Sequence, residues 1–91
     1  MSAITVTMQH IEDGMARCAS HCPVALALID AFPEAVGIFV NADHLKIWPR
    51  WSVEPAYLEM SPEVQNFVFA FDNGEPVEPF AFTLDYPAVT P

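Results

Sequence analysis

The segment at residues 23–32 constrains the fold most, because it is apolar at every position except Asp30. Pro23 fits the first turn of a helix, where its missing N–H group has no partner to lose. Pro33 ends the helix. At about 100° per residue, the apolar side chains cover nearly the whole helix circumference, a pattern typical of helices buried on more than one side. We therefore predict that this segment is the central helix of the fold.

Apolar and polar residues alternate elsewhere in the chain, with the period of a strand that has one buried face. The Asn-Ala-Asp sequence at residues 41–43 has turn chemistry and predicts a β-hairpin around it. The strand predictions cover residues 4–7, the hairpin at 35–48, a short edge strand at 56–58 and a last strand at 80–85.

Two further helical segments are predicted from their terminal residues. Residues 8–13 form a short helical turn that Thr7 caps and Gly14 ends in the left-handed conformation. Ser61-Pro62-Glu63 is typical of a helix N-terminus, and Asn-Gly at residues 73–74 ends that helix. Its apolar stripe consists of Val64, Phe67, Val68 and Phe71.

One aromatic residue of this helix, Phe69, lies off the stripe. It either meets a second layer or faces water.

This order of elements indicates an α+β fold. We predict one domain over residues 1–91, with residues 87–91 as a flexible tail. About four strands form one mostly antiparallel sheet, and two to three helices pack on one of its faces.

Charge is distributed unevenly along the chain. The formal net charge is −9, and residues 51–91 contain seven carboxylates but no Lys or Arg. Residues 1–50 contain five carboxylates against three basic residues, so −7 of the charge lies in the C-terminal part. Such a field repels nucleic acids and anionic membranes and attracts basic protein surfaces.

The sequence also bears on the cellular compartment. Its first residues show no basic region followed by an apolar stretch, so we expect no secretory signal. Its longest uncharged apolar run, residues 22–29, is far shorter than the ~20 residues of a membrane-spanning helix. We expect a cytoplasmic protein, in the host cytoplasm if a bacteriophage encodes it.

The cluster of His10, Cys18, His21 and Cys22 is the one group of residues with metal-ligand chemistry. Three interpretations remain open: a zinc site, a redox pair in which the helix N-terminus lowers the pKa of a thiol, and a loop with one buried thiol. The spacing of the two cysteines is wider than the usual Cys-x2-Cys zinc pair, and the chain lacks a second half-site.

The sequence contains no nucleophile elbow, and its three glycines form no phosphate-binding loop. We therefore expect no enzymatic activity and no cofactor. The Trp48-Pro-Arg-Trp51 segment has two interpretations, a protein-binding anchor or a fold-stabilising pair of tryptophans.

Two stretches resemble small uncharacterised proteins of actinobacteria, tailed bacteriophages and prophages. One is Thr7-x-x-His10-Ile-x-x-Gly14 followed by Cys22-Pro-Val-Ala-Leu-Ala-Leu28, and the other runs from Ser61-Pro-Glu to Phe80-x-Phe82-x-Leu84. The resemblance covers about half of the chain and implies one compact fold in a phage-type context. It implies no catalytic residue.

Taken together, these patterns favour a non-enzymatic phage-type accessory protein that binds a basic, nucleic-acid-binding host protein. It would inhibit that partner by steric block or DNA mimicry, as anti-CRISPR and other anti-defence proteins do. The candidate partner-binding residues are Trp51, Glu54, Glu59, Phe69, Asp72, Glu75, Glu78 and Asp85. The first alternative is a small structural or regulatory homodimer, and the second is a zinc or thiol site at Cys18, His21 and Cys22.

Overall fold

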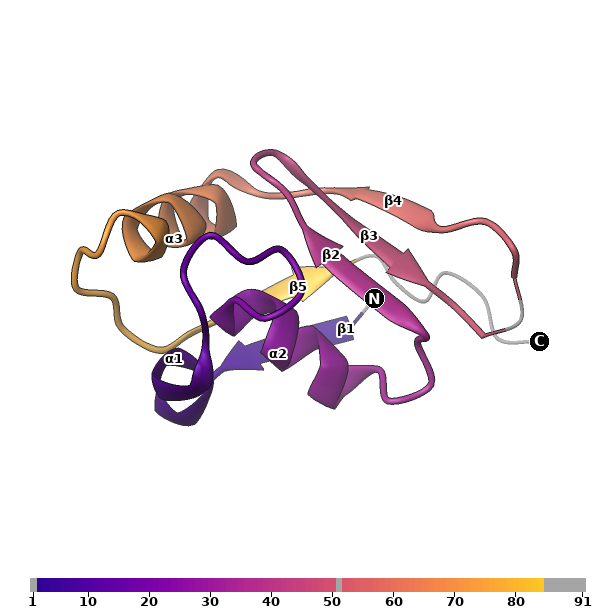
Figure 1. Ribbon diagram of the computed structural model, residues 1–91, viewed down its shortest axis with the longest axis horizontal. Helices are drawn as coiled ribbons and strands as arrows, with labels where there is room; N and C mark the ends of the chain where they lie inside the picture. The colour runs from indigo at the N-terminus through magenta and orange to yellow at the C-terminus, as the bar shows by residue number, and fades with distance from the viewer. Residues whose placement is uncertain (1, 51, 85–91) are drawn as a thin grey trace.

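A computed structural model of the chain describes residues 2–50 and 52–84. Within this part, five strands and three helices are present, and the predicted α+β class is confirmed (Figure 1). In chain order they are β1 (Ser2–Val6), α1 (Met8–Asp13), α2 (Pro23–Ala31), β2 (Gly37–Val40), β3 (His44–Trp48), β4 (Ala56–Glu59), α3 (Pro62–Asp72) and β5 (Phe80–Leu84). The predicted tail at residues 87–91 lies outside the described residues.

The strands form two antiparallel sheets, where one sheet was predicted. The first strand, β1, pairs with the last strand, β5, and the second sheet has the order β2-β3-β4. Helix α2 contacts β1 of the first sheet and β2 of the second (Figure 1). The helices therefore do not simply cover one face of one sheet, because α2 packs against both sheets.

The central position predicted for α2 is confirmed for its first two turns. Val24, Ala25 and Leu28 are fully buried, in one core with apolar residues of both sheets. Ile29 near the end of the helix is 43% exposed, and Asp30 is also exposed. The last turn of α2 therefore faces solvent.

Helix α1 begins as predicted and ends differently. The Thr7 side chain accepts a hydrogen bond from the backbone N–H of His10, which confirms the N-cap. Gly14 is extended, with φ −73° and ψ 154°, so the prediction of a left-handed stop is wrong. A Cβ atom at Gly14 would lie 2.6 Å from Cδ of Pro23, so glycine is required by the close approach of the α2 N-terminus.

Helix α3 follows its predicted pattern from end to end. The Ser61 hydroxyl accepts a hydrogen bond from Val64 N–H, and Gly74 after the helix has a φ of +76°. Val64 and Phe67 of the stripe are buried, whereas Phe69 is 68% exposed. Of the two possibilities for Phe69, the structure shows that it faces water.

The helices of the described residues also bear on membrane insertion. None of them has both the length and the apolar character needed to cross a bilayer.

Candidate partner-binding surfaces

The acidic side chains of the described residues are not neutralised by Lys or Arg. The contacts between carboxylates and basic side chains in residues 2–50 and 52–84 are hydrogen bonds to histidines: Asp30 Oδ2 lies 2.6 Å from His10 Nε2, and Asp43 Oδ1 lies 2.8 Å from His44 Nδ1. The hydrogen bond from His44 lowers the pKa of Asp43. Within the described residues, the negative charge is therefore not cancelled by Lys or Arg side chains.

The predicted partner-binding residues lie at two separate places. Glu75 and Glu78 belong to the loop after α3, at one end of the long axis of the molecule, and Glu54 belongs to the segment before β4 at the opposite end (Figure 1). The molecule measures 40 × 22 × 21 Å along its principal axes. Trp51 and Asp85 lie outside the described residues.

We call the first group the α3-end surface. It consists of Phe69, Asp72, Glu75 and Glu78. Asp72 is half-buried, and its Oδ1 accepts a hydrogen bond of 2.8 Å from the backbone N–H of Arg17, whose φ of +61° is rare for a residue with a side chain. Asp72 therefore stabilises the loop between α1 and α2, which contains Arg17. Glu75 and Glu78 are exposed, and their carboxylates bond no described residue.

The second group is the β4-edge surface, which consists of Glu54, Tyr57 and Glu59. All three are exposed, and Tyr57 is 66% exposed. The backbone of Glu54 is held by Ser52, whose Oγ accepts from Glu54 N–H and donates to Glu54 C=O. Neither glutamate carboxylate bonds any described residue.

Sequence reasoning missed a row of side chains on the outer face of the three-stranded sheet. Phe39, Lys46 and Tyr57 are partners across β2, β3 and β4. Lys46 Nζ lies 5.7 Å from the Phe39 ring centroid and 5.9 Å from the Tyr57 ring centroid, which is within cation–π range. The period-2 alternation of the strands was a signal that these residues share the polar face, but the register that places Lys46 between two rings was not visible.

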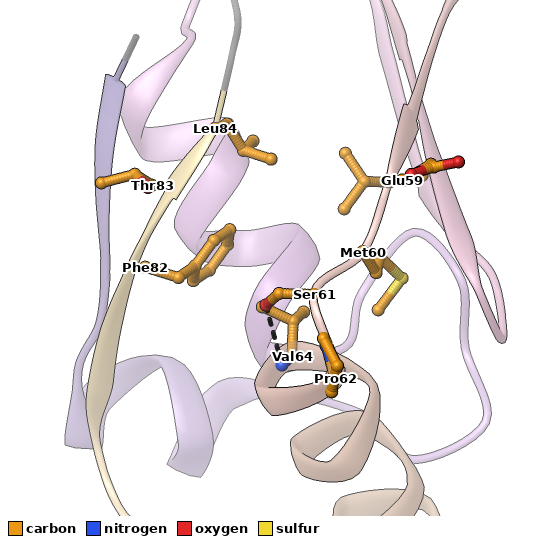
Figure 2. Close-up of a pocket in the computed structure, with 9 residues that line it drawn as sticks. Glu59, Met60, Ser61, Pro62, Val64, Phe82, Thr83 and Leu84 are labelled. Carbon is orange, nitrogen blue, oxygen red and sulfur yellow. Dashed lines mark hydrogen bonds between the residues drawn. The ribbon is translucent and has the colours of Figure 1, made fainter.

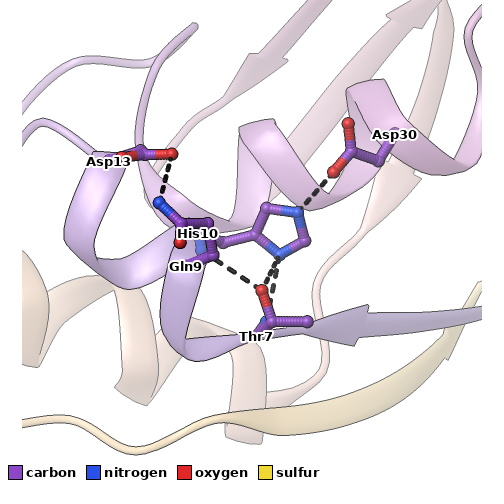
Figure 3. A network of polar contacts seen from close by, with 5 residues as sticks. All are labelled: Thr7, Gln9, His10, Asp13 and Asp30. Carbon is purple, nitrogen blue, oxygen red and sulfur yellow. Dashed lines mark hydrogen bonds and ion pairs between the residues drawn. The ribbon is translucent and has the colours of Figure 1, made fainter.

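The predicted metal candidate His10 belongs to another network (Figure 3). Its Nδ1 accepts the Thr7 backbone N–H at 3.0 Å, so the proton of the neutral ring lies on Nε2, which donates to Asp30. This network joins the end of β1 to α1 and α2. No group of three or more His, Cys, Asp or Glu side chains in the described part of the chain could hold a metal ion.

Cys22 is the N-cap residue of α2, and Cys18 lies in the loop before it. Cys18 is half-buried, with its Sγ 3.6 Å from His21 Nδ1, and Cys22 is buried. Burial raises the pKa of the Cys22 thiol and outweighs the opposite effect of the Ala25 and Val24 backbone N–H groups. The lowered thiol pKa that the redox interpretation predicts is therefore not found at Cys22, which is a buried thiol.

These environments predict different reactivity for the two thiols. In the native protein near neutral pH, Cys18 is expected to react with a disulfide reagent such as DTNB well before Cys22, because the thiolate of Cys22 is disfavoured and covered. Stopped-flow absorbance measures the two phases. Cys18→Ser should remove the fast phase alone, and a denaturant should merge the phases. Equal native rates would contradict the assignment.

A cavity of about 320 Å³ lies between the two sheets (Figure 2). Phe82 and Leu84 of β5 line it on one side. Met60, between β4 and α3, and Val64, in the first turn of α3, line it on the other. The side chain of Glu59 points away from it (Figure 2). The packing between β5 and the end of β4 is therefore incomplete.

Comparisons with known protein families, curated proteins and solved structures gave no match for this chain.

Proposed function

We propose that this chain is a non-enzymatic binding protein that inhibits a nucleic-acid-binding partner by occupying the basic surface of that partner. One observation carries the proposal: exposed carboxylates on two surfaces have no Lys or Arg partner within the described chain. Carboxylates that are already paired would have to exchange partners on binding. Unpaired ones form new charge-assisted bonds with an incoming Lys or Arg.

The few basic residues do not offset these surfaces. Lys46 lies between two aromatic rings on the outer face of the sheet, and no ion pair in residues 2–50 and 52–84 joins Lys46, Arg17 or Arg50 to a carboxylate. With a net charge of −9, the chain steers toward basic surfaces at a rate that falls as salt is added. The resemblance to phage and prophage proteins agrees with an accessory protein that blocks a host factor in the manner of anti-CRISPR inhibitors or DNA mimics.

A gel-shift competition against a panel of nucleic-acid-binding proteins tests the proposal. The chain is expected to displace nucleic acid from a susceptible partner at low ionic strength and to lose this effect as salt rises, because screening shortens the reach of the field. No displacement at low salt, or displacement that is indifferent to salt, would contradict the proposed function.

Two double variants test which surface binds. Glu75→Gln with Glu78→Gln neutralises the α3-end surface, and Glu54→Gln with Glu59→Gln neutralises the β4-edge surface by the same charge. Both should fold as the wild type does, since these side chains are exposed and unpaired in the described structure. Whichever surface contacts the partner, the double variant in that surface is expected to slow association with the partner more than the other double variant does. The other variant carries the same change in charge and is therefore the matched control.

A second candidate function is a structural or regulatory homodimer. The exposed side chains of Phe39, Tyr57 and Phe69 favour it, because exposed aromatic residues are enriched at protein interfaces. Light scattering over a range of concentrations and salt separates the two functions. A stable dimer that covers these side chains supports the homodimer and argues against the inhibitor.

A further inference from the structure

Within residues 2–50 and 52–84, the outer edge of β4 pairs with no other strand. In the sheet order β2-β3-β4, both outer strands have an edge away from β3. The edge of β2 is partly covered, because Val40 N–H donates to the carbonyl of Ala19. Within the described residues, the main chain of β4 forms hydrogen bonds with β3 alone. Figure 1 shows β4 at the margin of the molecule.

The alternation of hydrogen bonds between β3 and β4 identifies which backbone N–H and C=O groups of β4 point away from the sheet. The N–H of Met60 donates to the carbonyl of Asp43 at 3.3 Å, one step beyond the His44–Glu59 pair of the register. Hydrogen-bonded and non-bonded pairs alternate along an antiparallel ladder. Ala56 and Leu58 therefore bond β3, and the N–H and C=O groups of Tyr57 and Glu59 point away from the sheet.

Burial shows that β4 is the least covered strand. It has no buried residue, whereas each of the other four described strands has two. Leu58 on its inner face is half-buried, and the cavity between the sheets begins at Glu59 and Met60. A strand added beside β4 would complete the hydrogen bonds of Tyr57 and Glu59 and shield Leu58.

The charges beside β4 favour a basic segment at this edge. Glu54 precedes β4 and Glu59 ends it, and both carboxylates are exposed and unpaired with the described chain. The exposed ring of Tyr57 lies between them in sequence. Lys46 Nζ lies 5.9 Å from its centroid, so an incoming cation would have to approach the other face of the ring. An acidic segment would be repelled here, and a segment with Lys or Arg would be attracted.

We propose that the β4 edge accepts an extended, basic segment of the partner protein as an additional antiparallel or parallel strand. The segment alternates Lys or Arg with apolar residues, because side chains of a strand alternate between the two faces of a sheet. This inference rests on the proposed function for the basic character of the partner. It adds the location and the mode of binding, which is strand addition to a sheet edge.

A synthetic acetylated Lys-Val-Lys-Val-Lys-Val-Lys peptide tests the proposal, with fluorescence anisotropy for affinity and NMR for location. Binding is expected to shift the amide signals of Tyr57 and Glu59 and to slow their hydrogen exchange, with smaller changes at Ala56 and Leu58. The same peptide with N-methyl groups on alternate residues keeps its charge and loses its edge hydrogen bonds. It is expected to bind at least about tenfold more weakly.

Two variants of Tyr57 distinguish the contribution of its main chain to peptide binding from that of its side chain. Tyr57→Pro removes the outward N–H, while Tyr57→Ala keeps it and removes only the ring. The proline variant is expected to weaken binding of the unmodified peptide to the level of the methylated peptide, and the alanine variant to weaken it less. Thermal unfolding of both variants checks that they fold. The methylated peptide gives the same test on the wild-type chain if the proline variant does not fold.

The failure of this inference differs from the failure of the proposed function. If both peptides bind equally, or if the shifts fall on the α3-end surface, strand addition is wrong and basic-partner binding stands. If neither peptide binds at low salt and no basic protein is displaced from nucleic acid, both are wrong. A dimer that pairs β4 with β4 of a second copy would also overturn the inference.

Discussion

Replacing Leu28 with alanine is expected to lower the free energy of unfolding by about 2–5 kcal/mol. Leu28 is completely buried in α2, and this helix packs against β1 of one sheet and β2 of the other. The cavity left by the deleted side chain would therefore loosen the contact between both sheets and the helix. A small domain has a total stability of about 5–15 kcal/mol, so the loss is a large share of it.

Thermal denaturation measures this loss, because about 1 kcal/mol corresponds to roughly 4–8 °C in a domain of this size. Ile29→Ala is the matched control, since it shortens a branched aliphatic side chain at the next position of the same helix. Ile29 is 43% exposed, and its replacement should lower the melting temperature much less. Similar shifts for the two variants would show that α2 is not the centre of the core.

Local signals in the sequence were sufficient to predict the elements. Proline at the first turn of α2 and Ser61 before α3 mark helix starts through the chemistry of their own backbone and side chains. Alternation located the strands, because it reports which side chains share a buried face. These signals need no knowledge of distant parts of the chain.

The partition of the strands into two sheets could not be predicted in the same way. Alternation indicates a buried face but not the strand that pairs with it. Pairing of β1 with β5 joins the two ends of the described chain, and α2 packs against β1 of this sheet and β2 of the other. The extended backbone of Gly14 has a similar origin, since it follows from the close approach of Pro23 in three dimensions.

The candidate site was predictable in its charge and not in its geometry. The excess of carboxylates after Arg50 is visible in the sequence, and Phe69 was correctly placed off the buried stripe of α3. The division of the carboxylates between the loop after α3 and the β4 edge requires the fold. The pKa of the Cys22 thiol depends on two opposing effects: burial raises it, and the backbone N–H groups at the helix N-terminus lower it. Burial is the larger effect, and its depth is known only from the fold.

Replacing Phe67 with alanine is expected to have the second large effect, a loss of about 3–5 kcal/mol in the free energy of unfolding. The ring of Phe67 lies 4.7 Å from that of Phe80 in β5 and 6.4 Å from that of Phe71, measured between centroids. This aromatic group joins α3 to the two-stranded sheet, so its removal should loosen α3 and raise amide exchange throughout that helix.

Phe69→Ala provides a control in the same helix, because the identical side chain is deleted two residues later at a position that is 68% exposed. It should leave the melting temperature and the amide exchange of α3 nearly unchanged, while reporting any contribution of the α3-end surface to partner binding. If Phe69→Ala destabilises the protein as much as Phe67→Ala, α3 packs through its other face. If Phe67→Ala alone destabilises it, α3 is anchored on β5, and the exposed ring of Phe69 is free to contact a partner.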